Sequence, residues 1–74
     1  MSRLPLCTFR QMARILRQLG FQLVRHEGSH AVWVHADGRI TVVPDHPGEA
    51  LGRGLIRRIL REIDLTIEEY IRLR

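Results

Sequence analysis

The sequence predicts one α+β domain over residues 1–74, with a helix, three antiparallel strands, a second helix and a short third helix. Two observations carry this prediction. Apolar residues recur at helical spacing near both ends of the chain, whereas β-branched and aromatic runs separated by glycine-containing turns fill the middle. Runs of like elements favour a layered fold, with both main helices packed on one face of the sheet.

The first helix is expected over Thr8–Leu19. Its apolar positions form one stripe, made of Phe9, Met12, Ala13, Leu16 and Leu19. Thr8 and Gln11 have the spacing of a capping box, in which each side chain bonds a free backbone N–H of the other residue. Gly20 follows as a left-handed C-cap. The opposite face is basic and forms either a solvated surface or phosphate contacts, through Arg10, Arg14 and Arg17.

Three strands are expected next, at residues 21–26, 30–35 and 39–43. They are rich in β-branched and aromatic residues, and Pro44 ends the third. Gly28-Ser29 separates the first two strands, and Ala36-Asp37-Gly38 supplies hairpin turn chemistry between the last two. Turns this short imply an antiparallel meander.

After a loop over Asp45–Gly54, helical spacing returns from Leu55, with apolar positions at Ile56, Ile59, Leu60 and Ile63. Thr66 and Glu69 predict a capping box for a short helix over Leu65–Tyr70, and Leu65 against Tyr70 predicts its hydrophobic staple. The order of elements is that of a small double-stranded-RNA-binding-type domain. A fold alone does not establish a function.

Composition points to a polyanionic partner. Arginine supplies all twelve basic residues against eight acidic ones, which gives a net charge of +4. Its planar guanidinium grips phosphate and stacks on bases, although genome composition or a hot habitat also favours arginine. No run approaches the ~18 apolar residues of a membrane span, and the first residues lack the apolar core of a signal peptide. With Cys7 as a lone, small apolar residue, these features predict a cytoplasmic protein without membrane association.

Four histidines lie close together in the sequence, at His26, His30, His35 and His46. Zinc binding is disfavoured, because no second cysteine exists and the first three histidines do not keep one parity along strands. We therefore expect no metal and no other cofactor, and we place proton transfer first, because histidine exchanges protons near neutral pH.

The tripeptide Gly28-Ser29-His30 is the main candidate for chemistry. The glycine permits a tight turn, Ser29 can bond phosphate, and His30 begins a strand, flanked by Arg25 and by basic residues of the second helix. From spacing alone, an ordinary hairpin turn is the commoner explanation. The second candidate, Val43-Pro44-Asp45-His46, leads to Arg53-Gly54 at a helix start, where N–H groups favour anions. A plain loop explains that segment more simply.

Taken together, these segments resemble the HicA family of bacterial toxins, the RNA-cleaving half of a toxin–antitoxin pair. The resemblance runs from about Gln11 to Tyr70. It rests on Leu19-Gly20-Phe21, Arg25 with Gly28-Ser29-His30, Val43-Pro44 with His46, Arg53-Gly54 before Ile59-Leu60, and Leu65-Thr66 with Glu68-Glu69-Tyr70.

The resemblance implies a double-stranded-RNA-binding-like fold, metal-independent cleavage of messenger RNA, and a HicB-type antitoxin that covers the active face. The histidine of the family's Gly-Ser-His motif is catalytic, and that motif ends here at His30. The family's basic residue before a glycine matches Arg53. Two positions depart from the family pattern. Leu55 stands where a hydroxyl residue is frequent, and Ile63-Asp64 stands in a turn that often carries glycine.

The expected function is thus that of a type II toxin, an endoribonuclease in which His30 transfers protons and Arg25 or Arg53 stabilises charge on the phosphate. His46 is a weaker candidate for a second proton-transfer group. The expected RNA contacts are Arg25, Ser29, His46, Arg53 and Arg57. Two alternatives stay open: a non-catalytic RNA-binding module that uses basic helix faces alone, and a purely structural partner of a HicB-like protein.

Overall fold

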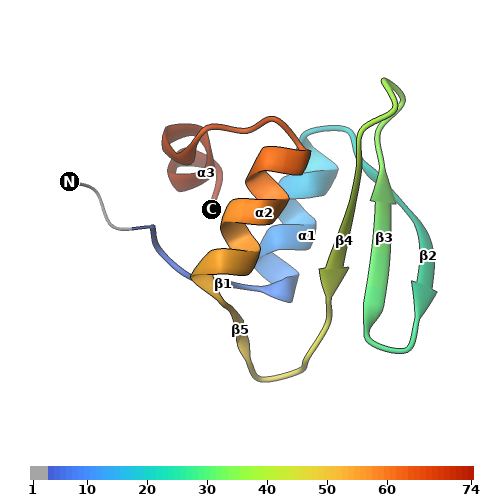
Figure 1. Cartoon of the computed structure of the whole chain (residues 1–74), viewed down its shortest axis with the longest axis horizontal. Helices are drawn as coiled ribbons and strands as arrows, with labels where there is room; N and C mark the ends of the chain where they lie inside the picture. Colours follow the sequence, from blue (N-terminus) through green and yellow to red (C-terminus); the bar gives the residue numbers. More distant parts are fainter. Residues whose placement is uncertain (1–3) are drawn as a thin grey trace.

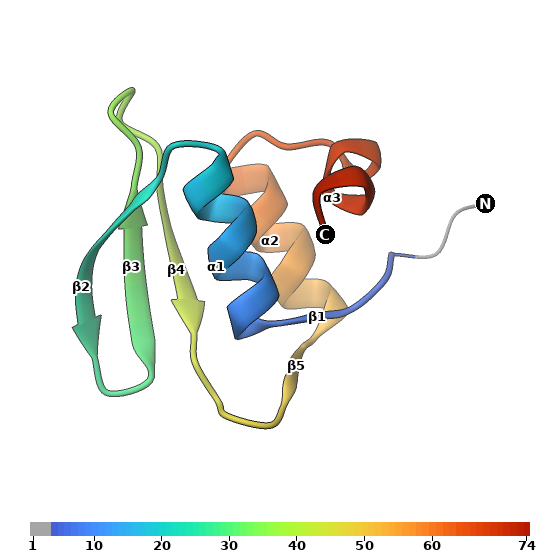
Figure 2. The same ribbon diagram turned by 180° about the vertical axis from the view of Figure 1, so that it is seen from behind.

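An antiparallel sheet in the order β2-β3-β4 forms one layer of the molecule, and the two longer helices cover one of its faces (Figures 1 and 2). This computed structural model describes residues 4–74. The strands are β2 (Gln22–Glu27), β3 (His30–Val34) and β4 (Ile40–Pro44), and the helices are α1 (Phe9–Gln18), α2 (Arg53–Glu62) and α3 (Ile67–Leu73). The expected α+β class and antiparallel meander are confirmed.

Capping residues determine where α1 begins and ends. The Thr8 hydroxyl accepts a bond from the Gln11 backbone N–H at 3.1 Å, and the Gln11 side chain accepts one from the Thr8 N–H at 2.9 Å. This reciprocal pair satisfies two donors that the first helical turn leaves free. At the other end Gly20 has a φ of +93°, a conformation that L side chains rarely adopt. Both predictions for this helix are confirmed.

The same device begins α3. The Thr66 hydroxyl accepts from the Glu69 N–H at 3.1 Å, and the Glu69 carboxylate accepts from the Thr66 N–H at 3.0 Å. The carboxylate also accepts from the Thr66 hydroxyl at 3.0 Å, and its two bonds, from the backbone N–H and the hydroxyl of Thr66, hold the pKa of Glu69 below its ordinary value. The helix extends to Leu73, past the predicted end at Tyr70, and it places the Tyr70 ring in the core.

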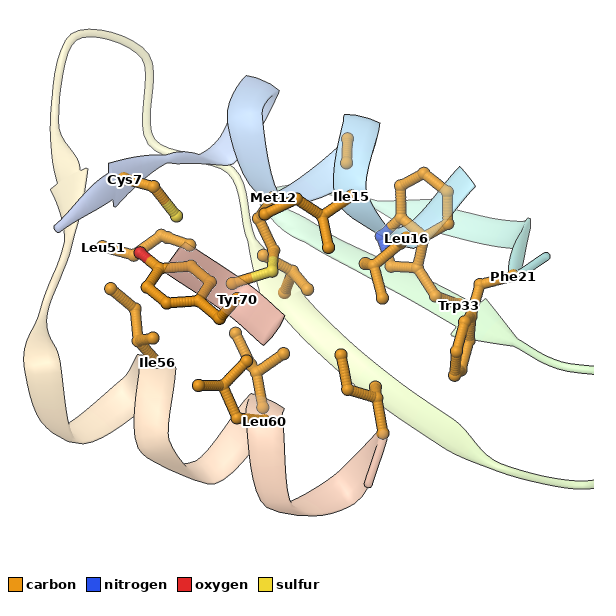
Figure 3. Packing of buried hydrophobic residues seen from close by; sticks show 14 of the residues in the cluster. Cys7, Met12, Ile15, Leu16, Phe21, Trp33, Leu51, Ile56, Leu60 and Tyr70 are labelled. Carbon is orange, nitrogen blue, oxygen red and sulfur yellow. The ribbon is translucent and has the colours of Figure 1, made fainter. Parts of the chain in front are cut away.

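The core fills the space between the sheet and the helices (Figure 3). Alternate residues of β3 and β4 point into it, so Ala31, Trp33, Thr41 and Val43 are buried. Trp33 is fully buried, and the guanidinium of Arg17 from α1 lies 5.2 Å from its ring centroid. Most of the other large buried side chains come from the three helices and from the residue that caps the end of α2, among them Met12, Ile15, Leu16, Ile56, Ile59, Ile63 and Tyr70.

The prediction of a loop over Asp45–Gly54 is wrong in part. A short strand β5 (Ala50–Leu51) pairs with β1 (Cys7–Thr8), and α2 begins at Arg53, ahead of the expected Leu55. A two-residue strand is too short to show an alternating pattern. The pairing of β1 with β5 depends instead on contacts between segments that are far apart in the sequence. The cap position of α2 is Gly52, which has no side chain to form a capping bond, so no capping side chain marks the helix start.

The segments near the two ends of the described chain are held together. The Tyr70 hydroxyl donates to the Pro5 carbonyl at 2.7 Å, and Arg74 Nε donates to the Leu6 carbonyl at 2.9 Å. Between them lies Cys7, whose burial raises the pKa of its thiol. In residues 4–74, no helix is long and apolar enough to cross a membrane.

Candidate active site

His30 is the first residue of β3 and follows a two-residue turn. Glu27 at the end of β2 pairs with His30, so Gly28 and Ser29 alone form the connection. Gly28 has a φ of +56°, and Ser29 does not have a positive φ. Residues with a side chain rarely adopt a positive φ, so the first position of this loop favours glycine. The predicted glycine turn is confirmed, and it leaves the His30 side chain exposed.

His30 lies on the open face of the sheet. Since Ala31 and Trp33 point toward the helices, the alternation along β3 turns His30 the other way. Glu27 is directly opposite His30 on the same face, and Arg25 lies on that face opposite Val32. The Arg25 Nε atom is 3.6 Å from the Glu27 Oε1 atom. The structure thus places Arg25, Glu27 and His30 in one polar row.

Glu27 is absent from the residues expected at the site. It precedes Gly28-Ser29 directly, and a two-residue hairpin turn always pairs the residues on either side of it. Side chains opposite each other in an antiparallel pair have Cβ atoms about 4.5–5.5 Å apart. That rule, applied to the predicted turn, identifies Glu27 as the carboxylate nearest to His30 in the sheet.

Apart from Gln22 at the start of β2, most of the rest of the open face is apolar. Val24 and Ile40 have exposed fractions of 57% and 55%, unusually large for aliphatic residues on one sheet face. A register shift between Leu23 and Arg25 leaves Val24 without a partner in β3, and Val24 borders a shallow hollow that Val34 also lines. The polar row therefore lies at the edge of an apolar surface made of Val24, Val32, Val34, Ile40 and Val42, which we call the outer apolar face.

The turn before His30 is tied to the loop that follows β4. The Ser29 carbonyl accepts a hydrogen bond from the Asp45 N–H. The Asp45 Oδ2 atom lies 3.8 Å from His26 Nε2, and the His26 ring stacks on Phe9 at the start of α1. Because His26 pairs with buried Ala31, this cluster lies on the helix side of the sheet.

His46 follows Asp45 and lines a groove between the loop and α1, away from the outer apolar face. It is exposed, and its carbonyl accepts from the Glu49 N–H at 3.1 Å, which closes a turn over 46–49. His35 has a different environment: its Nδ1 atom accepts from the Asp37 N–H at 3.0 Å, and its ring contacts Phe21 edge-on. Among residues 4–74, no three His, Cys, Asp or Glu side chains converge as metal ligands would.

The arginines of α2 do not flank His30, so that expectation is wrong. Arg53 Nε donates to the Leu4 carbonyl at 3.0 Å, and Arg57 lines a hollow against the start of α3. Arg58 donates to the Val42 carbonyl at 3.0 Å and so covers the free edge of β4. The reason is the packing of α2, which buries Ile56 and Ile59 against the inner side of the sheet. RNA binding by Arg53 and Arg57 stays a prediction.

Comparison with known proteins agrees with this architecture. The profile of a protein family described as "HicA toxin of bacterial toxin-antitoxin" matches residues 9–65, which run from the first residue of α1 to the connection before α3. No curated protein sequence matches the chain. The match covers most of the 74 residues and includes the Gly28-Ser29-His30 turn, β3, β4 and α2. The chain therefore belongs to the HicA family of toxins of bacterial toxin–antitoxin systems.

Proposed function

We propose that this toxin is a metal-independent endoribonuclease that cuts messenger RNA in the cytoplasm, with His30 as its catalytic residue. The single observation that carries the proposal is the position of His30. It is exposed at the start of a strand, fixed by a glycine turn, and lies on the open face with Glu27 opposite and Arg25 on the same face. Of the four histidines, only His30 combines this exposure with two charged neighbours on the open face.

The geometry suits cleavage by the RNA's own 2′-OH. His30 removes the 2′-OH proton as the oxygen attacks phosphorus, the bond from phosphorus to the 5′-oxygen breaks, and water donates a proton to the leaving 5′-oxygen. The products are a 2′,3′-cyclic phosphate and a free 5′-OH. General base catalysis of this kind contributes about 10²–10⁴-fold. Arg25, diagonal to His30 across the strands, is long enough to reach a phosphate held there and to stabilise its extra negative charge.

Glu27 is the group that orients His30 and stabilises the positive charge that the imidazole gains when it takes up the proton. It is opposite His30 in the strand pairing, and Arg25 Nε lies 3.6 Å from its carboxylate, so the carboxylate is within reach of the imidazole. His46 is not placed for the second proton transfer, because its loop faces α1 on the helix side of the sheet and His30 lies on the open face. Glu27→Gln keeps the size of the side chain but removes its charge and one of its two acceptor oxygens, and we expect slower cleavage with unchanged RNA affinity.

The test is cleavage of a defined messenger RNA by purified wild type, His30→Ala and His46→Ala, in the presence of a chelator. We expect His30→Ala to lose about 10²–10⁴-fold in rate at saturating RNA, whereas His46→Ala should lose RNA affinity but keep its rate at saturating RNA. Because His30 is exposed, its removal should leave the melting temperature unchanged, which a thermal melt verifies. Full activity of His30→Ala would refute the proposal, and RNA binding without cleavage by the wild type would favour the non-catalytic RNA-binding module.

The outer apolar face supports the second half of the proposal, a HicB-type antitoxin. Exposed apolar area of this kind marks protein interaction sites, and here it is continuous with His30. A protein that covers it also blocks RNA from the polar row. Val24→Asp should weaken antitoxin binding strongly, with little effect on folding because more than half of Val24 is exposed. Unchanged binding would place the antitoxin on another surface.

A further inference from the structure

A groove on the helix side of the sheet is not used by the mechanism above. The N-terminal half of α1 forms one wall and the loop 45–49 forms the other, and together they enclose about 580 Å³. Small-ligand sites usually measure roughly 300–1,000 Å³, so one nucleotide fits. Phe9 and Ala13 give the helix wall an apolar floor, and Arg10 and Arg17 give it positive charge.

The arginines of this wall are not engaged by acidic partners. Arg10 and Arg14 form no ion pair with any side chain in residues 4–74, and both are exposed. Arg10 and Arg17 line the groove, and Arg14 joins them around the adjoining hollow on the same helix. The sequence did not decide whether the basic face of α1 is a solvated surface or a phosphate contact. In the structure this face borders a concave site.

Arg10 is also poorly placed for the stability of α1. It lies in the first turn, whose free N–H groups carry partial positive charge, and this turn contains no acidic residue. A cation at that position is unfavourable for the helix. A bound anion would relieve this repulsion. Arg10 therefore destabilises α1 in the free protein, and the binding of a phosphate would remove that destabilisation.

The loop wall has the opposite charge. Asp45 and Glu49 both line it; Asp45 is close to His26, whereas Glu49 forms no ion pair among the described residues. A nucleotide carries groups that complement both walls. Its anionic phosphate suits the arginines of the helix wall, and the amino group on cytosine, adenine or guanine suits the carboxylates of the loop wall. Carboxylates accept hydrogen bonds from such amino groups.

The groove also lies next to the turn that precedes His30. Asp45, which lines the groove, donates its N–H to the carbonyl of Ser29, the residue next to His30. The β2–β3 turn, the loop after β4 and the start of α1 lie at the same end of the molecule in both views (Figures 1 and 2). An RNA strand leaving His30 can therefore pass the turn and enter the groove.

We propose that this groove binds one unpaired nucleotide flanking the scissile bond, with its phosphate on Arg10 and Arg17 and its base stacked beside Phe9. Glu49 accepts a hydrogen bond from the amino group of the base. The groove thus prefers cytidine, adenosine or guanosine over uridine. This inference rests on the proposed RNA substrate but does not depend on which residue performs the cleavage.

The test measures binding of single-stranded 2′-O-methyl RNA, which 2′-OH attack cannot cut, by fluorescence anisotropy at several salt concentrations. We expect Arg10→Ala to weaken binding by about tenfold and to lower the salt slope by about 0.7. Arg72→Ala is the matched control, because it removes the same charge from exposed α3. Arg10→Ala should be at least as stable as wild type, so lost affinity cannot be attributed to unfolding.

The base preference gives a second readout. Wild type should bind cytidine and adenosine oligomers more tightly than uridine oligomers, and Glu49→Ala should lose this difference while it still binds uridine RNA. Equal affinities and salt slopes for Arg10→Ala and Arg72→Ala would overturn the inference. So would an Arg10→Ala variant that loses antitoxin binding alone. If RNA binding depends on Arg10 but the wild type cuts nothing, the groove stands and the proposed activity fails.

Discussion

The turn that holds His30 depends on one backbone angle, and a matched pair of glycine substitutions measures it. A Cβ added at Gly28 or at Gly54 meets no atom within 4 Å, so neither substitution creates a clash. Gly28 has a φ of +56°, whereas Gly54 lies in the first turn of α2 and is absent from the residues with positive φ. The two positions therefore differ in conformation and not in available space.

The expected changes have opposite signs. At Gly28, alanine meets a left-handed penalty of about 1–2 kcal/mol, offset by about 0.4–1 kcal/mol from the smaller entropy of the unfolded chain. The net loss is about 1 kcal/mol, and the melting temperature falls by roughly 4–8 °C for a domain of this size. At Gly54, alanine should stabilise α2 by about 0.5–1 kcal/mol.

Thermal melts followed by circular dichroism measure both variants, with Gly28→Asn as a third. Asparagine visits the left-handed region more readily than alanine, so Gly28→Asn should fall between wild type and Gly28→Ala. If Gly28→Ala and Gly54→Ala shifted the melting temperature in the same direction, backbone conformation would not be what selects glycine before Ser29-His30.

Two further predictions concern stability. Tyr70→Phe keeps the buried ring but removes the bond to the Pro5 carbonyl, and it should cost about 1 kcal/mol in denaturant unfolding; an unchanged midpoint would mean that water replaces the hydroxyl. Backbone and hydroxyl bonds from Thr66 lower the pKa of Glu69, so its stabilisation is complete above the ordinary value of 4.5 and is lost as pH falls through the lowered one. Glu69→Gln should therefore be less stable than wild type at neutral pH and approach it on acidification, and a constant difference would contradict this.

Features that depend on neighbouring residues could be predicted from the sequence. Both capping boxes are confirmed because Thr8 with Gln11 and Thr66 with Glu69 interact within one turn. The Gly28-Ser29 turn is confirmed for the same reason. The three strands were found within about two residues at each end, although the structure ends the second at Val34 rather than His35.

Features set by distant contacts could not be predicted. The β1–β5 pair joins Cys7 to Leu51, and no pattern in either segment predicts that it pairs with the other. The direction of the Arg53 side chain depends on the Leu4 carbonyl. The face on which His30 lies follows from the burial of Trp33, which becomes known only when α1 is placed over β3.

The bond from the Tyr70 hydroxyl to the Pro5 carbonyl has a kinetic consequence. The hairpins around Gly28 and Gly38 close short loops, which cost little chain entropy and form early in folding. The contact of Tyr70 with Pro5 spans 65 positions. Nearly the whole chain must therefore be ordered before this hydrogen bond contributes to stability. We infer that the sheet forms first and that docking of α3 on the N-terminal segment completes the core. The last structure to form is then far from His30, and local opening at the chain ends need not disturb the turn that presents it.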